Sequence, residues 1–362
     1  MQKSRDFLAA LTDRVLVADG AMGTMLQAAD LSVDEDFRGL EGCNEILNVS
    51  RPDVIRGVHE AYLSAGADCV ETNTFGANAS NLGDYGIEDR IRELSEAGAR
   101  IAREAADRFT TDEQPRYVLG SIGPGTKLPT LGHMPYGQLR DAYHETAAGL
   151  ILGGADALVV ETCQDLLQTK SAVVGAHRAM AEVGRTIPLV CHVTVETTGT
   201  MLLGSEIGAA LTALEPLGID LIGLNCATGP AEMTEHLRYL AQSASVPVSV
   251  MPNAGLPVLA AGGAYYPLTP DELAEALDRF VREYGVSLVG GCCGTTPEHI
   301  AAVVERVRGL KAAPRTVSHA PAAASIYHEV PFRQDAGVLM IGERTNANGS
   351  KAFREPMLAG DW

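Results

Sequence analysis

The sequence predicts an α/β protein of the (β/α)8, or TIM-barrel, class. Short apolar runs rich in β-branched residues alternate with longer segments of helical period, a pattern typical of parallel strands joined by helices. The apolar runs lack polar alternation, as expected of strands buried on both faces. Eight strand–helix units fit within about 310 residues, and eight is the number that closes a barrel. The predicted strands are Val15–Asp19, Cys69–Asn73, Tyr117–Ile122, Ala157–Glu161, Leu189–Thr194, Leu221–Cys226, Val248–Pro252 and Ser287–Cys292.

The predicted helices between these strands carry start and stop signals. Thr269 and Glu272 form a capping box, and Gly285 is placed to end the same helix. Thr296, followed by proline, opens the last barrel helix, which Gly309 ends. A doubly wound sheet is the competing architecture, but it usually has fewer strands and a GxGxxG turn after its first strand. The corresponding turn here, DGAMGT, lacks that spacing, and the sequence therefore favours the barrel.

The composition and hydrophobic pattern of the sequence change after the predicted barrel. The stretch KAAPRTVSHAPAAAS is rich in Ala, Pro and Ser and has no hydrophobic period, which predicts an interdomain linker. The run Gly337–Gly342 then predicts a new buried strand. We therefore expect a barrel over residues 1–310, a linker over 311–330, and the truncated start of a second domain over 331–362.

Composition excludes several classes of function. Acidic residues outnumber basic residues by 46 to 28, which gives a net charge of −18. Such a surface repels phosphate backbones and anionic lipids, so we expect no nucleic-acid or membrane partner. Apolar stretches are interrupted well before about 18 residues, so no transmembrane helix is predicted. The seven cysteines are scattered and odd in number, and no signal peptide precedes them; we expect reduced thiols in a cytoplasmic protein.

Polar side chains gather where the predicted strands end. In a (β/α)8 barrel the carboxyl ends of the strands carry the active site, because the βα loops converge there. Taken singly, such a residue is more often a turn former, a helix cap or an ion-paired rim residue. Their common placement favours a functional site, which would include Asp19, Glu71, Thr72, Asn73, Glu161, Asn225, Cys226, Asn253, Cys292 and Cys293.

The cysteines give the most specific signal. Cys226 ends the sixth predicted strand and Cys292-Cys293 end the eighth. These strands flank the seventh, so the three thiols can converge at one side of the barrel mouth. Three thiolates with one exchangeable position suit a catalytic zinc ion (Zn2+). The alternative is that all three are small buried core residues. That is the role expected of Cys69, Cys163 and Cys191.

A three-thiolate zinc site favours one kind of chemistry. A free alkyl thiol has a pKa of about 8.5 and is mostly protonated at neutral pH, whereas a zinc-bound thiol is deprotonated. Three thiolates leave the metal site with a net negative charge, so a fourth, substrate sulfur keeps its electron density. Histidine ligands would instead favour Lewis-acid hydrolysis. The ligand set therefore predicts thiol alkylation.

With these residues in place, the chain resembles the homocysteine S-methyltransferase family from about Val15 to Leu310. The resemblance rests on DGAMGT, ETNTFGAN, GSIGP, VVETCQD, GLNCATGP, PNAGLP and GGCCGTTPEHI. It implies a homocysteine substrate and a zinc ion held by Cys226, Cys292 and Cys293. It also implies that Asn253 is a possible fourth ligand without substrate. The amino-acid end of homocysteine would be bound by Asp19, the amides of Gly20 and Ala21, and Glu161, with Glu161 taking the ammonium group.

The tail carries a second resemblance. IGERTNANGS is similar to the opening strand of the pterin-binding barrel, which binds methyltetrahydrofolate in the multidomain, cobalamin-dependent members of the family. This implies methylcobalamin as the methyl donor, bound by a downstream domain, with the cobalamin-binding and methyltetrahydrofolate-binding domains as partners. Two alternatives stay open. One is a standalone enzyme that takes methyl from betaine or S-methylmethionine, and the other is a non-catalytic zinc- or thiol-binding scaffold.

Overall fold

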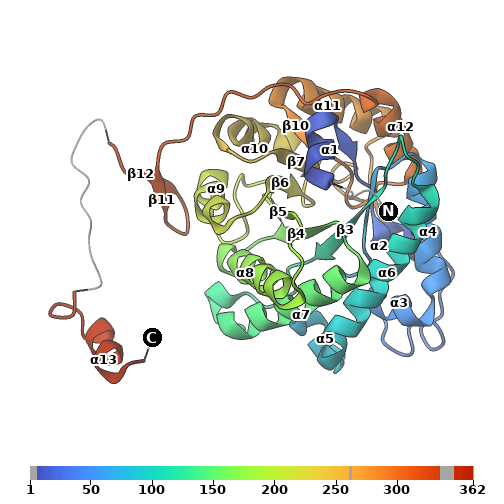
Figure 1. The fold of residues 1–362 in the computed structure, drawn as a ribbon. Coiled ribbons are helices and arrows are strands. Elements are labelled where there is room, and N and C mark those ends of the chain that lie inside the picture. Colours follow the sequence, from blue (N-terminus) through green and yellow to red (C-terminus); the bar gives the residue numbers. More distant parts are fainter. Residues whose placement is uncertain (1–5, 261–262, 335–345, 362) are drawn as a thin grey trace.

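Eight parallel strands form a ring at the centre of the computed structural model, which describes residues 6–260, 263–334 and 346–361 (Figure 1). The strand order is β1-β10-β7-β6-β5-β4-β3-β2, and a parallel bridge between Ala18 and Cys69 joins the two ends. The predicted barrel is therefore confirmed. Its strands are β1 (Leu16–Val17), β2 (Cys69–Glu71), β3 (Tyr117–Ile122), β4 (Ala157–Cys163), β5 (Leu189–Val193), β6 (Leu221–Asn225), β7 (Val248–Met251) and β10 (Val286–Val289).

Each predicted strand region overlaps one of these strands; several strands end earlier than predicted, whereas β4 runs two residues further, to Cys163. The clearest case is the last one, predicted to reach Cys292, where β10 ends at Val289. The strands end early because residues near their carboxyl ends leave the hydrogen-bonding pattern of the sheet and enter the loops. Asp19, Cys226 and Cys292 all lie just beyond the strands.

Helices cover the outside of the barrel, and one of them follows each strand along the chain. The predicted capping box of Thr269 and Glu272 is present, and Gly285 ends that helix with φ +65°. Thr296 caps the last barrel helix as predicted, whereas that helix ends at Val307 with Arg308, not Gly309, as its C-cap. No helix within the described residues is both long and apolar enough to cross a membrane. The outer helices are α4 (Pro52–Ser64), α6 (Ile91–Phe109), α7 (Tyr136–Gly153), α8 (Leu166–Val183), α9 (Ile207–Leu214), α10 (Pro230–Ser243), α11 (Pro270–Tyr284) and α12 (Pro297–Val307).

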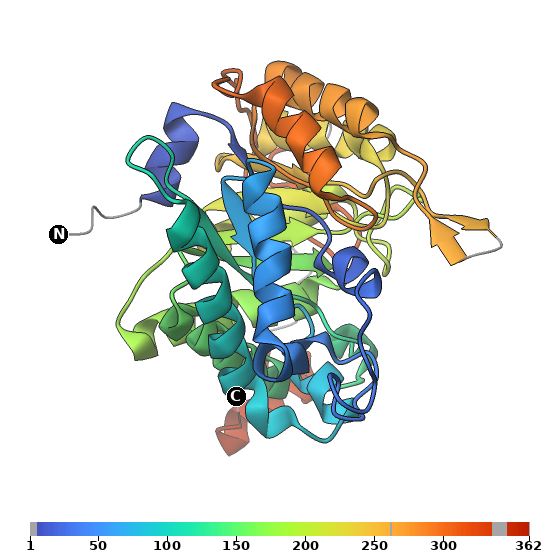
Figure 2. The same ribbon diagram turned by 90° about the vertical axis from the view of Figure 1, so that its right-hand side faces the viewer.

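Shorter elements sit in the loops and at the ends of the barrel. Figure 2 shows the helix α1 and the β8–β9 hairpin at opposite ends of the barrel. The hairpin leaves the loop after β7, so it marks the carboxyl-terminal face. These elements are α1 (Phe7–Asp13), α2 (Met22–Gln27), η1 (Asn44–Ile46), α3 (Leu47–Ser50), α5 (Ala79–Asp84), η2 (Glu88–Arg90), η3 (Pro129–Leu131), η4 (Glu215–Leu217), β8 (Val258–Ala260) and β9 (Gly263–Tyr265).

The strands bury both faces, in two separate apolar clusters. Alternate residues such as Val15 and Val17 face the helices, whereas Leu16 lies in the cluster that fills the barrel interior. From α1, Phe7 packs edge-on against Tyr117 with ring centroids 5.6 Å apart and closes the amino-terminal end. The interior is thus a solid core with its polar opening at the other end, which fixes where a site can form.

Residues 311–334 pack along the outside of the barrel. Arg315 donates to four backbone carbonyl groups around the end of α10, the shortest bond being 2.7 Å to Val246 O. Further along, β11 (Ala322–Ala324) and β12 (Glu329–Pro331) form a hairpin beside α9. Glu329 on this hairpin accepts from the Tyr239 hydroxyl at 2.6 Å.

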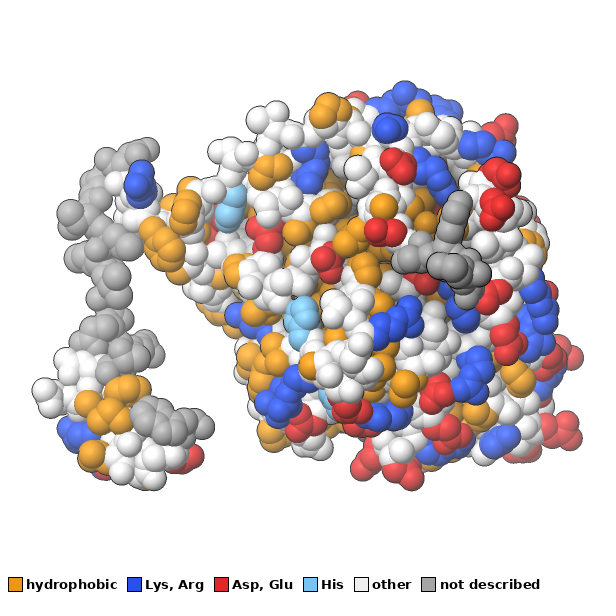
Figure 3. Space-filling model, viewed as in Figure 1, with side chains coloured by type: hydrophobic (Ala, Val, Ile, Leu, Met, Phe, Trp, Pro, Cys, Tyr) orange, Lys and Arg blue, Asp and Glu red, His pale blue; other side chains and the backbone are white. Residues whose placement is uncertain are grey.

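The outer surface of that hairpin carries hydrophobic side chains (Figure 3), the exposed ones being Ile326, Tyr327, Val330 and Phe332. The predicted strand Gly337–Gly342 lies outside the described residues. After it comes α13 (Lys351–Ala359).

Arg315 is expected to hold the 311–334 segment on the barrel. Arg315→Ala removes donors to four carbonyl groups and should lower the local free energy of unfolding by about 1–3 kcal/mol. The segment should therefore be cleaved faster in limited proteolysis, with cut sites mapped by mass spectrometry. Arg333→Ala, at an exposed position of the same segment, is the matched control. Equal cleavage rates for the two variants would contradict the anchoring role.

Candidate active site

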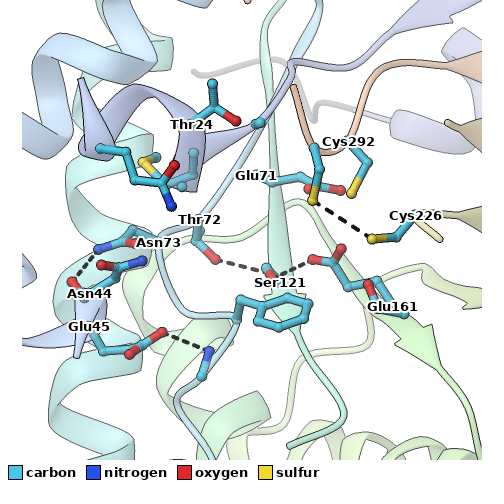
Figure 4. A pocket seen from close by; sticks show the side chains of 18 of the residues that line it. Thr24, Asn44, Glu45, Glu71, Thr72, Asn73, Ser121, Glu161, Cys226 and Cys292 are labelled. Atoms are coloured by element: carbon cyan, nitrogen blue, oxygen red, sulfur yellow. Dashed lines mark hydrogen bonds between the residues drawn. The ribbon is translucent and has the colours of Figure 1, made fainter. Parts of the chain in front are cut away.

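A cavity of about 560 Å³ opens at the carboxyl-terminal end of the barrel. Figure 4 shows Cys226, Cys292 and Glu161 on one side of it and Asn44 and Glu45 on the other. Within the described residues its lining includes five carboxyl side chains and no Lys, Arg or His. The cavity therefore offers acceptors and thiols to a ligand but no cationic group. The five carboxyl residues are Asp19, Glu45, Glu71, Asp84 and Glu161.

Three cysteine sulfur atoms converge in this cavity, as the order of the strands predicts. Cys226 follows β6, and Cys292 and Cys293 follow β10. All three Sγ atoms lie within 4.8 Å of one another, and the Cys226 and Cys293 sulfur atoms are 3.8 Å apart. Each thiol is partly exposed, whereas Cys43, Cys69, Cys163 and Cys191 are buried. The core reading thus holds for the other cysteines and not for these three.

The backbone presents the thiols in a specific way. Cys226 has φ +60°, a left-handed conformation that is unfavourable for a residue with a side chain and often marks a functional site. The Cys292 amide donates to Pro252 O at 2.8 Å, and Ala254 donates to Cys293 O at 2.9 Å. These bonds tie the cysteine pair to the loop after β7. The position of each sulfur is therefore set by the ends of three neighbouring strands.

The three thiols share charge among themselves. Hydrogen bonds from Cys226 and Cys292 lower the pKa of Cys293 to about 3. Hydrogen bonds to Cys226 and Cys293 raise the pKa of Cys292 well above its ordinary value. Crowding thus favours a single thiolate in the absence of a cation. A soft dication would let all three sulfurs ionise, and three thiols at this spacing fit a tetrahedral thiolate site with one open position.

Three carboxyl groups face the thiols. Asp19 and Glu161 are buried to within 3% and 5% residual exposure, and burial raises the pKa of both, to about 7 for Glu161. Burial also raises the pKa of Glu71, and the charges of Glu161 and Asp19 raise it further. These carboxyl groups are consequently close enough to influence one another across the mouth of the barrel.

Hydrogen bonds fix two of these carboxyl groups. Glu161 Oε1 accepts from the Ser121 hydroxyl at 2.5 Å, and Oε2 accepts from Asn225 Nδ2 at 3.0 Å. Both oxygen atoms of Asp19 accept from the backbone amide of Glu71, at 3.1 and 3.0 Å. Two adjacent strand ends thereby hold Asp19, and Ser121 and Asn225 hold Glu161. Both are pre-positioned before any ligand arrives.

The remaining predicted site residues have other partners in this structure. Asn253 Oδ1 accepts from the Cys293 amide at 3.1 Å, so its side chain braces the cysteine pair. The Ala21 amide donates to the Thr295 hydroxyl at 3.2 Å, and Gly20 lines the cavity beside it. The proposed roles of Asn253 in metal binding and of the Gly20 and Ala21 amides in carboxylate binding stay predictions.

Tyr266 is one of several lining residues that the sequence analysis did not single out. Tyr266 lies just after β9, and its ring packs against Gly294, where any side chain would collide with it. Gly294 has φ +78°, so glycine suits this position on two grounds. The glycine was visible in the sequence, but nothing there indicated which aromatic residue it would admit.

The fold and the site define a barrel enzyme with a thiol-lined active site. The chain belongs to the homocysteine S-methyltransferase family, whose pattern matches residues 16–307. It is 67% identical over 357 residues to methionine synthase from Mycobacterium tuberculosis, which covers 99% of this chain and 30% of that protein. It is 65% identical to methionine synthase from Mycobacterium leprae, again over 30% of that protein. The chain thus spans about a third of the length of these relatives.

A solved structure gives the same fold. The homocysteine methyltransferase MmuM from Escherichia coli, in its oxidised form, aligns with a TM-score of 0.66 at 25% identity. The alignment covers 83% of this chain and 99% of that one. The barrel alone therefore accounts for nearly the whole of that relative.

The raised pKa of Glu161 predicts a pH-dependent stability. Its carboxyl group binds a proton more tightly folded than unfolded, so stability is fully present below about pH 4.5 and declines as the pH rises to about 7. In chelator-treated protein this decline should reach roughly 3 kcal/mol. Urea unfolding across this range should show a flatter profile for Glu161→Gln than for the parent. Glu275→Gln, at an exposed position of α11, is the control and should leave the profile unchanged. Parallel profiles for parent and Glu161→Gln would contradict the assignment.

Proposed function

We propose that this barrel binds homocysteine and presents its sulfur as a zinc thiolate for methylation by methylcobalamin, giving methionine. The observation that carries the proposal is the convergence of Cys226, Cys292 and Cys293 in one cavity. Membership of the homocysteine S-methyltransferase family supports the substrate. The high identity to proteins named methionine synthase supports the product.

The three thiols are the proposed zinc ligands because their chemistry fits that ion. Sulfur donors at this spacing suit a borderline-soft dication. Bound zinc would lower the pKa of the homocysteine thiol, so that the sulfur is held as a nucleophile at neutral pH. The chain's own part is to set the sulfur atoms in place through the loops after β6, β7 and β10. Asn253 is proposed as a fourth ligand when homocysteine is absent.

The polar groups beside the thiols are proposed to orient the amino-acid end of homocysteine. Glu161 is already fixed by Ser121 and Asn225 and offers its remaining lone pairs to an ammonium group. Asp19 and the amides of Gly20 and Ala21 line the same cavity and are proposed to bind the amino-acid end beside Glu161, with the two amides donating to its carboxylate group. Holding both ends of the substrate restricts its sulfur to one geometry, and such positioning of a reacting group increases the reaction rate.

The methyl donor is proposed from the tail of the chain. IGERTNANGS resembles the start of a pterin-binding barrel, and the match to the mycobacterial relatives extends over 99–100% of this chain. We accordingly assign residues 1–310 to the homocysteine barrel, 311–330 to a linker, and 331–362 to the start of a methyltetrahydrofolate-binding domain. Methylcobalamin would be bound by a further domain outside this chain.

Removal of one ligand should abolish zinc binding without unfolding the barrel. Cys293→Ala should reduce bound zinc from one ion per chain to well below stoichiometry, measured by atomic emission after exhaustive dialysis, because two thiolates leave an incomplete site. Cys69→Ala removes a buried thiol of the barrel interior and should keep the full zinc content. Circular dichroism checks that both variants are folded. A Cys293→Ala protein that still holds one zinc would refute the ligand assignment.

The sulfur-activating step should work without the missing domains. Supplied with homocysteine and free methylcobalamin, the zinc-loaded chain should form methionine slowly, because loss of cofactor positioning removes several kcal/mol of rate enhancement. The chelator-treated chain should show only the background rate. Betaine and S-methylmethionine, tested in parallel, should give no methionine. Equal rates with and without zinc would disprove the mechanism, and turnover with betaine or S-methylmethionine alone would favour a standalone enzyme.

A further inference from the structure

Among the carboxyl groups of Asp19, Glu71 and Glu161, that of Glu71 is the one that the proposed function leaves without a role. Glu71 ends β2 and lines the cavity, and in Figure 4 it lies between Thr72 and the cysteine side. Its Oε1 atom is shielded from solvent, and no described residue donates a hydrogen bond to it. A shielded carboxyl oxygen without a donor is unfavourable, so such an atom calls for an explanation.

The neighbouring carboxyl groups differ from Glu71 in this respect. Both oxygen atoms of Asp19 accept from the Glu71 amide, and each oxygen of Glu161 accepts from a side chain. Glu71 uses only its backbone to hold Asp19, which leaves its side chain free. It is therefore the acceptor in this group with the most unused capacity.

A ligand in the cavity can supply the missing donor. Within the described residues no Lys, Arg or His lines the cavity, so the protein itself offers no cation to Glu71. A primary ammonium group carries a positive charge and three N–H donors in a compact volume. Three carboxyl groups, of Asp19, Glu71 and Glu161, face the same space and match the three donors.

We propose that Glu71 completes a three-carboxyl receptor for the ammonium group of the amino-acid substrate, and so selects α-amino thiols over thiols that lack the amino group. This inference rests on the proposed function and adds a specificity-determining residue to it. Charge-assisted hydrogen bonds to a shielded carboxylate are stronger than neutral ones, so Glu71 should account for much of that selectivity.

The experiment compares two thiols that differ only in the amino group, homocysteine and 4-sulfanylbutanoic acid. Isothermal titration calorimetry on the zinc-loaded chain gives the ratio of their dissociation constants. In Glu71→Gln this ratio should fall by about 10-fold to 100-fold, because affinity is lost for homocysteine and not for the deaminated thiol. Zinc content should stay at the parent level. Because the selectivity is a ratio, it does not depend on the fraction of folded protein.

Two further variants sharpen the test. Glu45→Gln changes a carboxyl group on the opposite side of the cavity, whose Oε1 accepts from the Gly76 amide at 2.7 Å, and should leave the ratio unchanged. Glu71→Asp keeps the charge but withdraws it by one methylene, so its ratio should lie between those of the parent and Glu71→Gln. If Glu71→Gln does not fold, a reduced ratio in Glu71→Asp carries the same conclusion.

The possible outcomes distinguish a failure of this inference from a failure of the proposed function. A parent chain that binds neither thiol overturns both. A parent chain that prefers homocysteine, with the preference intact in the Glu71 variants, overturns only the role of Glu71. Equal weakening of both thiols in Glu71→Gln would also overturn it, since that result indicates a general effect on the cavity.

Discussion

The crowding of acidic side chains at the carboxyl-terminal end of the barrel is the constraint on which the site depends. Three thiols and the carboxyl groups of Asp19, Glu71 and Glu161 share one cavity that has no cationic side chain among its described lining residues. Charges of one sign at such distances in a shielded site repel strongly, and the groups respond by holding protons. Burial is the largest cause of the raised pKa values of Glu71 and Glu161, and neighbouring negative charges raise both further. Hydrogen bonds to the other two thiols raise the pKa of Cys292. A cavity in this state is poised to accept positive charge.

The barrel tolerates this crowding because its stability comes from apolar clusters away from the site. The interior cluster is filled by side chains from all eight strands and closed at the far end by Phe7, while a second cluster joins the strands to the helices. Neither cluster includes the acidic groups of the site. The strained φ of Cys226 and the unpartnered oxygen of Glu71 are therefore tolerated at the rim, supported by a core that does not depend on them.

The strands and the convergence of the cysteines could be predicted from the sequence, whereas the conformations and contacts of the loops could not. The eight apolar runs are local signals, and barrel order follows from chain order, so Cys226 and Cys292 could be placed on the two strands that flank β7. The packing of residues 311–334 on α9 and α10 could not be predicted, because Arg315 binds backbone carbonyl groups that any sequence would offer. Tyr266 was missed for a similar reason, since its place over Gly294 depends on how far the β8–β9 hairpin extends.

The geometry also separates the two ends of a ligand. The Cys226 and Cys292 thiols and the Glu161 carboxyl group lie on one side of a cavity of about 560 Å³, whereas Thr24, Asn44 and Glu45 line the other (Figure 4). Cavities of this size commonly hold ligands larger than a small amino acid. A substrate held by its sulfur and its ammonium group would occupy the thiol side and leave the opposite side open. A substrate bound as proposed would lie against one wall with its sulfur accessible from the other side, as a group transfer to that sulfur requires.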